Sequence, residues 1–333
     1  MKLKSLKYLS CPSCKSDFLS VQKSTAANLE SGHIVCSNKK CRRRYFIRNG
    51  LANLTVYQKT NEKKAAASFG YEWQQYFNDK FEKKTVFGRD EMSDLEYFFR
   101  STGTRPSSIK QKRILDAGCG SSKLTALLSN NRPEIVIGFD IHDYIKLSYE
   151  KNKRIANVEI VQANIFNPPF KRGIFDIVWC NGVVHHTPDP YKAFLEISKL
   201  VKKGGRLYVW VYEKRFSPFK FTKDIFRFLK LDRLPYPYLK LISSFLAVIF
   251  LWLNRISLFL LLPFKSIIFK NYYIGHSLRK RNYDELTMTW FDALSPKYDY
   301  RFREEEIVNW FLGQGYKNII KNPHKIGICG TKS

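Results

Sequence analysis

The sequence predicts an α/β fold, in which a mostly parallel, doubly wound sheet is joined to a small metal-binding segment and interrupted by a helical insertion. Apolar strands alternate with helices between residues 111 and 212, and this alternation is typical of parallel sheets. Two closely spaced cysteine pairs lie within the first 41 residues, and an apolar, basic stretch follows the alternating region. We therefore expect a metal-binding domain at 1–56, a helical linker or cap at 57–110, the α/β domain at 111–212 and 303–333, and a helical insertion at 213–302.

The composition is that of a folded and strongly basic chain. Of the 333 residues, 44% are hydrophobic, which excludes a disordered chain, and the formal net charge is +28. Residues 1–64 carry a net charge of +11 and residues 213–296 carry +8. Such segments favour anionic partners, namely nucleic acid, an acidic membrane face or phosphorylated substrates, although a generally lysine-rich surface would give the same totals.

Four of the seven cysteines have the spacing of a zinc site. Cys11 and Cys14 ("CPSC") are followed by Cys36 and Cys41 ("CSNKKC"), and two such pairs supply the four thiolates of a tetrahedral zinc shell. The odd cysteine count and the lack of an apolar signal segment near Met1 favour metal binding in a reducing compartment over disulfides. We expect a structural Zn²⁺ ion and a cytoplasmic protein, which could be peripheral at the inner face of the membrane.

The segment after the second cysteine pair predicts a hairpin. "YFIRNGLANLTV" at 45–56 reads as two strands joined by a turn at Asn49-Gly50. Residues 8–56 as a whole resemble the zinc-ribbon domain of the small protein that activates several tRNA and protein methyltransferases. The ribbon could recognise a partner or substrate, or it could only stiffen the N-terminal part of the chain.

The α/β domain begins with "RILDAGCGSSKLTALLSN", a strand, a glycine-rich turn and a helix. Further strands are expected at 134–140, 158–164, 175–181 and 205–212, with helices at 144–156 and 190–203 and a final helix, "GQGY" turn and two strands within 303–332. Asp116, Asp140, Asn164 and Asn181 stand at strand ends. Because ligands bind beyond the carboxyl ends of parallel strands, these four side chains should line one crevice.

The motifs at these strand ends resemble those of class I S-adenosylmethionine-dependent methyltransferases, in particular the ubiquinone- and menaquinone-type methylases. The resemblance rests on "LDAGCGSS", on Asp140 placed 24 residues after Asp116, on "NIFNPPF", and on "FDIVWCNGVVHHTPDPYKAFLEISKLVKKGGRLYV". It implies a Rossmann-like sheet of seven strands, S-adenosylmethionine as cofactor, and Asp140 as the acceptor of both ribose hydroxyls. The implied cofactor-binding residues are Asp116, Gly118, Cys119, Gly120, Asp140, Ile141, Asn164, Ile165, Asn181 and Gly182.

Two positions depart from the family pattern. Ser122 stands where the family often has a third glycine, and its small side chain should be tolerated. Asn164 stands where the family has an adenine-contacting acid, and its amide could still meet the adenine amine, with weaker affinity for the cofactor.

The adjacent histidines after the fourth strand are the candidate catalytic residues. His185 and His186 point in different directions on a regular element and have no nearby third ligand, which argues against a metal site. One could pack against the adenosine while the other is structural. Alternatively His186, or less favourably His185, is the general base that deprotonates the methyl acceptor, since histidine titrates near neutral pH.

The insertion contains the most apolar part of the chain, residues 241–264. Its uninterrupted apolar run ends before Asn254 and Arg255, which disfavours a transmembrane span. A helix in the membrane interface, or a buried lid over the active site, is favoured instead, and the basic residues within 213–281 could contact an anionic membrane.

Three functions follow from these observations. The leading one is methyl transfer to an oxygen or carbon of a small lipophilic or lipid-linked substrate. An RNA methyltransferase that uses the basic ribbon is the alternative, although "NGVVHH" stands where amino-group methylases carry Asn-Pro-Pro-aromatic. A non-catalytic cofactor-binding partner protein is the third. The sequence predicts no particular oligomeric state.

Overall fold

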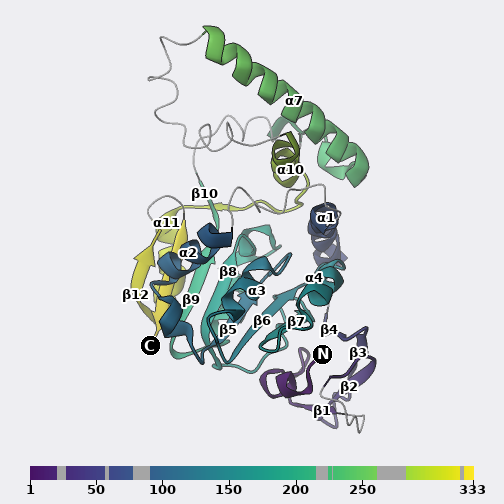
Figure 1. Cartoon of the computed structure of the whole chain (residues 1–333), viewed down its shortest axis with the longest axis vertical. Helices are drawn as coiled ribbons and strands as arrows, with labels where there is room; N and C mark the ends of the chain where they lie inside the picture. Colours follow the sequence, from purple (N-terminus) through teal and green to yellow (C-terminus); the bar gives the residue numbers. More distant parts are fainter. Residues whose placement is uncertain are drawn as a thin grey trace. The chain divides into compact units, whose positions relative to one another are not determined.

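The structure is a computed structural model that describes residues 1–20, 28–56, 60–77, 91–214, 224–226, 228–260, 283–322 and 326–333. The chain forms two compact units. The sheet unit comprises residues 1–70, 92–214 and 298–333, and the helical unit comprises residues 71–91 and 215–297. Figure 1 shows the sheet of the first unit and the long helix α7 of the second.

Seven strands of the sheet unit form the sheet that the sequence predicted. Their order is β7-β6-β5-β8-β9-β13-β12, and only β13 runs antiparallel to its neighbours. They are β5 (Arg113–Ala117), β6 (Ile135–Asp140), β7 (Val158–Gln162), β8 (Phe175–Asn181), β9 (Val201–Trp210), β12 (Tyr316–Lys321) and β13 (Gly327–Lys332). The central strands are buried along nearly their whole length, which explains their continuous apolar runs.

The predicted helices lie between these strands. In the sheet unit they are α3 (Lys123–Ser129), α4 (Ile145–Asn152), α5 (Pro190–Ser198) and α11 (Glu304–Gly313). Two 3₁₀ helices that the sequence did not predict are η2 (Pro106–Ile109) and η3 (Val184–His186). Helix α5 starts where the sequence suggests, because the Asp189 carboxylate accepts a hydrogen bond from the Lys192 amide (3.0 Å). It ends earlier than expected, since Val201 already pairs with Phe175 in β9.

The N-terminal region of the chain contributes more than a separate ribbon. Its elements are η1 (Leu3–Tyr8), β1 (Phe18–Ser20), β2 (Gly32–Cys36), β3 (Arg44–Arg48) and β4 (Leu51–Asn53). The expected hairpin is β3–β4, and β4 also pairs in parallel with β7, with Ala52 opposite Val161. The seven strands expected from the sequence are therefore part of one sheet of eleven strands. The pairing covers the β7 edge, which would otherwise expose unpaired backbone groups.

Polar contacts fix the ribbon to the sheet as well. The buried Glu159 carboxylate on β7 accepts hydrogen bonds from the Lys2 amide (3.0 Å) and the Ser5 hydroxyl (2.8 Å). The Ser10 amide donates to the carbonyl of Pro169 (2.9 Å), and Lys15 Nζ donates to that of Pro168 (2.9 Å). The "NPPF" segment thus supports the first cysteine pair.

The remaining elements complete the two units. Helix α1 (Thr60–Phe77) runs from the sheet unit into the helical unit, followed by α2 (Glu91–Thr102), and β10 (Tyr212–Glu213) pairs in parallel with β11 (Arg301–Phe302). The helical unit contains η4 (Leu231–Arg233), α7 (Tyr236–Leu260) and α10 (Tyr283–Leu294). Within the described residues no helix is long and apolar enough to cross a bilayer. Residues 261–264 of the apolar stretch lie outside the described residues.

Candidate active site and cysteine cluster

The glycine-rich loop after β5 folds onto the end of β6. Gly118 (φ +78°) and Gly120 (φ +49°) have left-handed backbones, which is the conformation that glycine adopts most readily. The amides of Gly118 and Cys119 both donate to the carbonyl of Phe139 (2.9 and 3.1 Å). The Gly120 amide donates to Asp140 Oδ2 (3.0 Å). The loop therefore places three of the predicted cofactor residues at the end of β6, and Gly120 binds the Asp140 carboxylate directly.

Ser122 fits this loop, as the sequence analysis expected. It has a left-handed backbone (φ 58°) and precedes the first residue of α3. Its hydroxyl donates to the Ser121 carbonyl (2.6 Å) and accepts from Asn152 Nδ2 (2.7 Å). Ser148 Oγ donates to the Gly120 carbonyl (2.7 Å), so α4 supports the loop from a second direction. These hydrogen bonds compensate for the strain of a non-glycine residue at this position.

The two predicted acids meet at the carboxyl ends of β5 and β6. Asp116 is buried and accepts a hydrogen bond from Thr125 Oγ1 (2.7 Å). Burial, with a smaller contribution from the charge of Asp140, raises the pKa of Asp116 to about 7. Asp140 Oδ1 accepts from the Ile141 amide (2.7 Å). Each Asp140 oxygen keeps a second lone pair, so this carboxylate can accept a diol while it remains fixed by the backbone.

The end of β8 adds an unsatisfied acceptor. The side-chain oxygen of Asn181 is buried and has no hydrogen-bond partner among the described residues. Gly182 follows with φ +80°, and its amide donates to the Trp210 carbonyl (3.2 Å). A ligand with a donor group would satisfy Asn181, which fits the expected cofactor.

Asn164 and Ile165 lie at the end of β7. Asn164 Nδ2 donates to the Val56 carbonyl (3.0 Å) and to Glu62 on α1 (2.7 Å), and its Oδ1 accepts from the Phe166 amide (3.0 Å). The Asn164 side chain thus ties β7 to β4 and α1 in this structure. Its contact with adenine stays a prediction, and so does the role of the buried Ile165.

The histidines form η3 directly after β8, and both are buried. His186 Nδ1 lies 2.8 Å from the Tyr298 carbonyl. A carbonyl only accepts, so Nδ1 carries the hydrogen and Nε2 has the lone pair of a base. The His186 ring also contacts the Phe69 ring, with centroids 5.0 Å apart.

His185 has a different environment. Its ring packs against those of Tyr212 (4.2 Å between centroids) and His186 (4.1 Å), and its carbonyl accepts from the Tyr300 amide (3.0 Å). Apart from the four cysteines, no group of three or more potential metal ligands occurs in the described part of the chain. His186 thus has the tautomer that a base requires, whereas His185 is packed between aromatic rings; the catalytic role of either histidine stays a prediction.

Sequence reasoning missed four residues of this site: Phe69, Val183, Tyr212 and Tyr298. An added Cβ at Gly118 would lie 2.3 Å from Val183 Cγ2, so the glycine loop and the histidine loop pack directly on each other. Tyr212 could have been found, because it is the last residue of the fifth predicted strand, 205–212. The Tyr298 carbonyl carries no sequence signal, since every residue has one.

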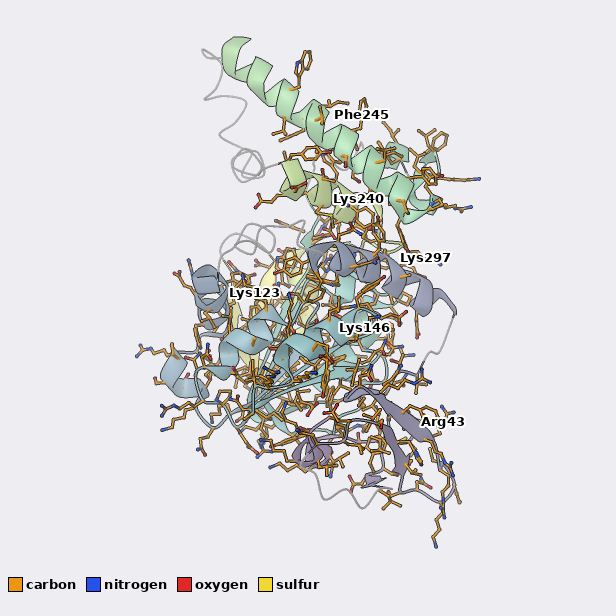
Figure 2. The ribbon with its side chains drawn as sticks, turned by 45° about the vertical axis from the view of Figure 1, so that its right-hand side comes forward. Arg43, Lys123, Lys146, Lys240, Phe245 and Lys297 are labelled. Atoms are coloured by element: carbon orange, nitrogen blue, oxygen red, sulfur yellow. The ribbon has the colours of Figure 1, made fainter. Side chains whose placement is uncertain are left out.

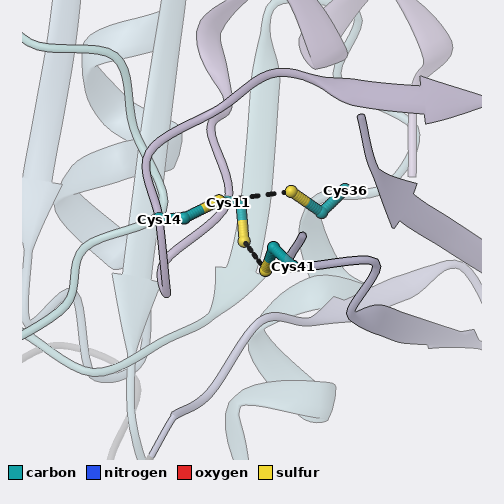
Figure 3. Close-up of side chains that lie close together, drawn as sticks. All are labelled: Cys11, Cys14, Cys36 and Cys41. Atoms are coloured by element: carbon teal, nitrogen blue, oxygen red, sulfur yellow. Dashed lines mark hydrogen bonds between the residues drawn. The ribbon is translucent and has the colours of Figure 1, made fainter. Parts of the chain in front are cut away.

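The cysteine cluster matches the predicted zinc site. All four Sγ atoms lie within 4.8 Å of one another, with Cys14–Cys36 at 3.3 Å and Cys11–Cys41 at 3.8 Å, as Figure 3 shows. A tetrahedral ion with Zn–S bonds of about 2.3 Å requires sulfurs about 3.8 Å apart. The donor set therefore fits Zn²⁺. Tyr45, which the sequence analysis did not single out, places its hydroxyl 3.2 Å from Cys11 Sγ.

A basic groove of about 1050 Å³ lies between the ribbon and α4. Arg43, Arg44 and Arg48 line one side and Lys146 the other, and Figure 2 labels Arg43 and Lys146. None of the three arginines forms an ion pair within the described part of the chain. The exposed Phe46 ring lies among them. Exposed cations beside an aromatic ring suit a polyanion with flat bases.

Comparison with known proteins agrees with this geometry. Residues 115–209 match the family described as "Methyltransferase domain". The chain is 24% identical over 120 residues to the tRNA U34 carboxymethyltransferase of Campylobacter fetus subsp. fetus, covering 35% of this chain and 43% of that protein. It is 29% identical over 119 residues to the ubiquinone biosynthesis O-methyltransferase of Coxiella burnetii, covering 34% of this chain and 50% of that protein.

The chain therefore spans about half the length of the curated relatives it matches. Among solved structures, magnesium protoporphyrin IX methyltransferase from Synechocystis PCC 6803 with bound SAH has a TM-score of 0.46 and 12% identity, covering 82% of this chain and 98% of that one. Residues 115–209 thus match a methyltransferase domain, and the predicted class I methyltransferase fold is confirmed.

Proposed function

We propose that the protein is an S-adenosylmethionine-dependent methyltransferase that acts on an oxygen or carbon of a small lipophilic or lipid-linked molecule. The observation that carries the activity is the direct packing of the glycine loop against the histidine loop, through Gly118 and Val183. This contact brings a carboxylate suited to a ribose diol, Asp140, onto the same sheet edge as a histidine whose tautomer suits a base, His186.

Each residue then has a defined task. When bound, S-adenosylmethionine supplies an electrophilic methyl group on a good leaving group, so most of the rate comes from positioning the acceptor. Asp140 and the Gly118–Gly120 loop hold and orient the cofactor. His186 Nε2 takes the proton of the acceptor, while the Tyr298 carbonyl holds its ring. The rings of Phe69 and Tyr212 exclude water around the histidines.

The helical unit supports a lipophilic acceptor. Its two helices pack through an apolar core that includes Leu239, Phe291 and Leu294, and α7 exposes large apolar side chains on its other side. One relative is named as an O-methyltransferase of ubiquinone biosynthesis. An apolar unit encoded between β10 and β11, within the α/β domain, is well suited to receive such an acceptor.

RNA is the second candidate substrate, and the groove beside Arg44 and Lys146 favours it. A polyanion in this groove would contact three arginines and could stack a base on Phe46. One relative is named as a tRNA-modifying enzyme. The groove also takes in Asp143 and Gln162, close to the cofactor edge of the sheet.

A labelling experiment separates the two candidates. The full chain is incubated with methyl-labelled S-adenosylmethionine and a fractionated cell extract, and label is counted in lipid, RNA, protein and small-molecule pools. We expect label in the lipid pool, lost in Asp140→Ala and retained in the control Glu305→Gln, which changes an exposed carboxylate on α11. If the label is found in RNA, the second candidate substrate replaces the lipophilic one. If the protein binds the cofactor but transfers no methyl group, it is a non-catalytic protein.

A further inference from the structure

The outer face of α7 is apolar and exposed. Tyr238, Leu241, Phe245, Val248 and Trp252 follow one another at intervals of three or four residues, so they share one face of the helix. Each of these five side chains is more than half exposed, and Phe245 is labelled in Figure 2. Soluble monomers rarely expose a contiguous apolar surface of this kind, so this face marks an interaction site.

The opposite face of α7 is already occupied. Leu239, Ser243 and Ala247 are buried, and the core between the two helices contains Leu286 and Trp290 of α10. Because α10 covers this side and begins with Asp284 and Glu285, lipid cannot surround α7. Helix α7 can therefore contact a bilayer only along its outer face, lying in the plane of the interface.

The side chains on the outer face distinguish a bilayer from a second helix. A paired helix would use aliphatic residues with charged neighbours that set register. Here Tyr238, Phe245 and Trp252 alternate with Leu241 and Val248. The stripe is flanked by Ile242, Ser244, Ile249 and Leu251, and the charged residues of α7 are Lys240 and Arg255, both basic. Aromatic residues beside aliphatic ones are typical of helices at a membrane surface.

The charge of the sequence that contains α7 indicates whether the bilayer is anionic or neutral. Residues 233–283 contain eight lysines and arginines and no aspartate or glutamate. Such a segment is attracted to anionic headgroups over a distance of about a Debye length. We propose that the outer face of α7 inserts into the headgroup region of an anionic lipid bilayer, with the five apolar side chains below the phosphates.

This inference goes beyond the proposed methyl transfer, because docking requires neither cofactor nor acceptor. The 25-residue helix would lie along about 37 Å of membrane surface. Docking would bring the protein to the phase that holds a lipophilic acceptor. Bilayer binding and methyl transfer can therefore fail separately, and the two tests do not depend on each other.

The test is flotation of the full chain with vesicles, without cofactor. Vesicles contain either phosphatidylcholine alone or phosphatidylcholine with about a quarter of phosphatidylglycerol. The variant is Leu241→Glu, and the matched control is Leu312→Glu, which changes another leucine that is more than half exposed but lies on α11. Each variant is also checked by light scattering for oligomeric state and by calorimetry for S-adenosylmethionine binding, which reports on the sheet unit.

We expect the wild type and Leu312→Glu to float with anionic vesicles and not with neutral ones. Leu241→Glu should reduce the partition coefficient at least about tenfold while cofactor binding stays unchanged. Failure of the wild type to float, or flotation that Leu241→Glu does not reduce, would overturn the proposal. A wild-type dimer that Leu241→Glu converts to a monomer, without vesicle binding, would assign this face to a second copy instead.

Discussion

Substitution of Gly118 by alanine should uncouple the glycine loop from the histidine loop. The new Cβ would lie 2.3 Å from Val183 Cγ2 and 2.9 Å from Cγ1, whereas carbon atoms in contact stay about 3.5–4.0 Å apart. Overpacking of this kind costs about 1–3 kcal/mol. Alanine at φ +78° adds about 1–2 kcal/mol of backbone strain. We therefore expect Gly118→Ala to lower the free energy of unfolding by about 2–5 kcal/mol.

The double variant distinguishes the clash from the strain. Val183→Ala alone removes two methyl groups from a half-buried side chain and should cost about 1–2 kcal/mol. In Gly118→Ala/Val183→Ala the two methyl contacts at 2.3 and 2.9 Å are removed, a closer-than-usual contact of 3.1 Å with the Cβ of residue 183 is left, and the backbone strain remains. The double variant should then be more stable than additivity predicts, by about 1–3 kcal/mol.

Urea unfolding of the wild type, the two single variants and the double variant measures this coupling. Calorimetric titration with S-adenosylmethionine measures whether the glycine loop still binds the cofactor. If the change in the free energy of unfolding of the double variant equals the sum of the changes in the two single variants, the packing of the two loops is refuted. A Gly118→Ala protein that binds the cofactor as tightly as the wild type would refute the role of the loop in the cofactor site.

Other predictions concern the base, the zinc ion, the buried acid and the ribbon. His186→Gln should lower the rate of methyl transfer by about 10²–10⁴-fold with cofactor binding retained, and single-turnover kinetics against His185→Phe would show whether the effect belongs to His186 alone. Cys14→Ser should abolish the expected one-to-one zinc content, measured by atomic emission, and lower the melting temperature, because ribbon folding and metal binding are one event. The pKa of Asp116 is raised to about 7 in the folded chain from an ordinary value of 3.8, so the free energy of unfolding should fall as pH rises from about 4 through 7. Asp116→Asn should remove this fall, which amounts to at most about 4 kcal/mol. Unfolding experiments that give the same pH dependence for Asp116→Asn and the wild type would contradict this prediction. Glu159→Ala should release the N-terminal residues from β7, seen as faster amide exchange in β4 and β7 than in the wild type.

The sequence predicted the features that local patterns specify. The strand ends at Asp116, Asp140 and Asn181 follow from short apolar runs, and the cysteine cluster follows from cysteine spacing, because each apolar run and each cysteine pair lies within a few residues. Both therefore appear in the structure where they were expected.

The features that were missed depend on residues far apart in the chain. Pairing of β4 with β7 joins segments about a hundred residues apart in the sequence. The residues "LAN" of β4 carry no pattern that predicts a parallel partner strand. The Tyr298 carbonyl reaches His186 across 112 residues. Asn164 was interpreted only as a ligand-contacting residue, because its partner Glu62 lies 102 residues away on helix α1. Non-local contacts of this kind are set by packing, which periodicity does not report.

The most direct test of the central claim is calorimetric titration of the full chain with S-adenosylmethionine, followed by single-turnover transfer of its labelled methyl group into a lipid extract. The account predicts one bound cofactor per chain, loss of binding in Asp140→Ala, and label in the lipid extract that His186→Gln reduces. A chain that does not bind S-adenosylmethionine, or whose binding Asp140→Ala leaves unchanged, would contradict it.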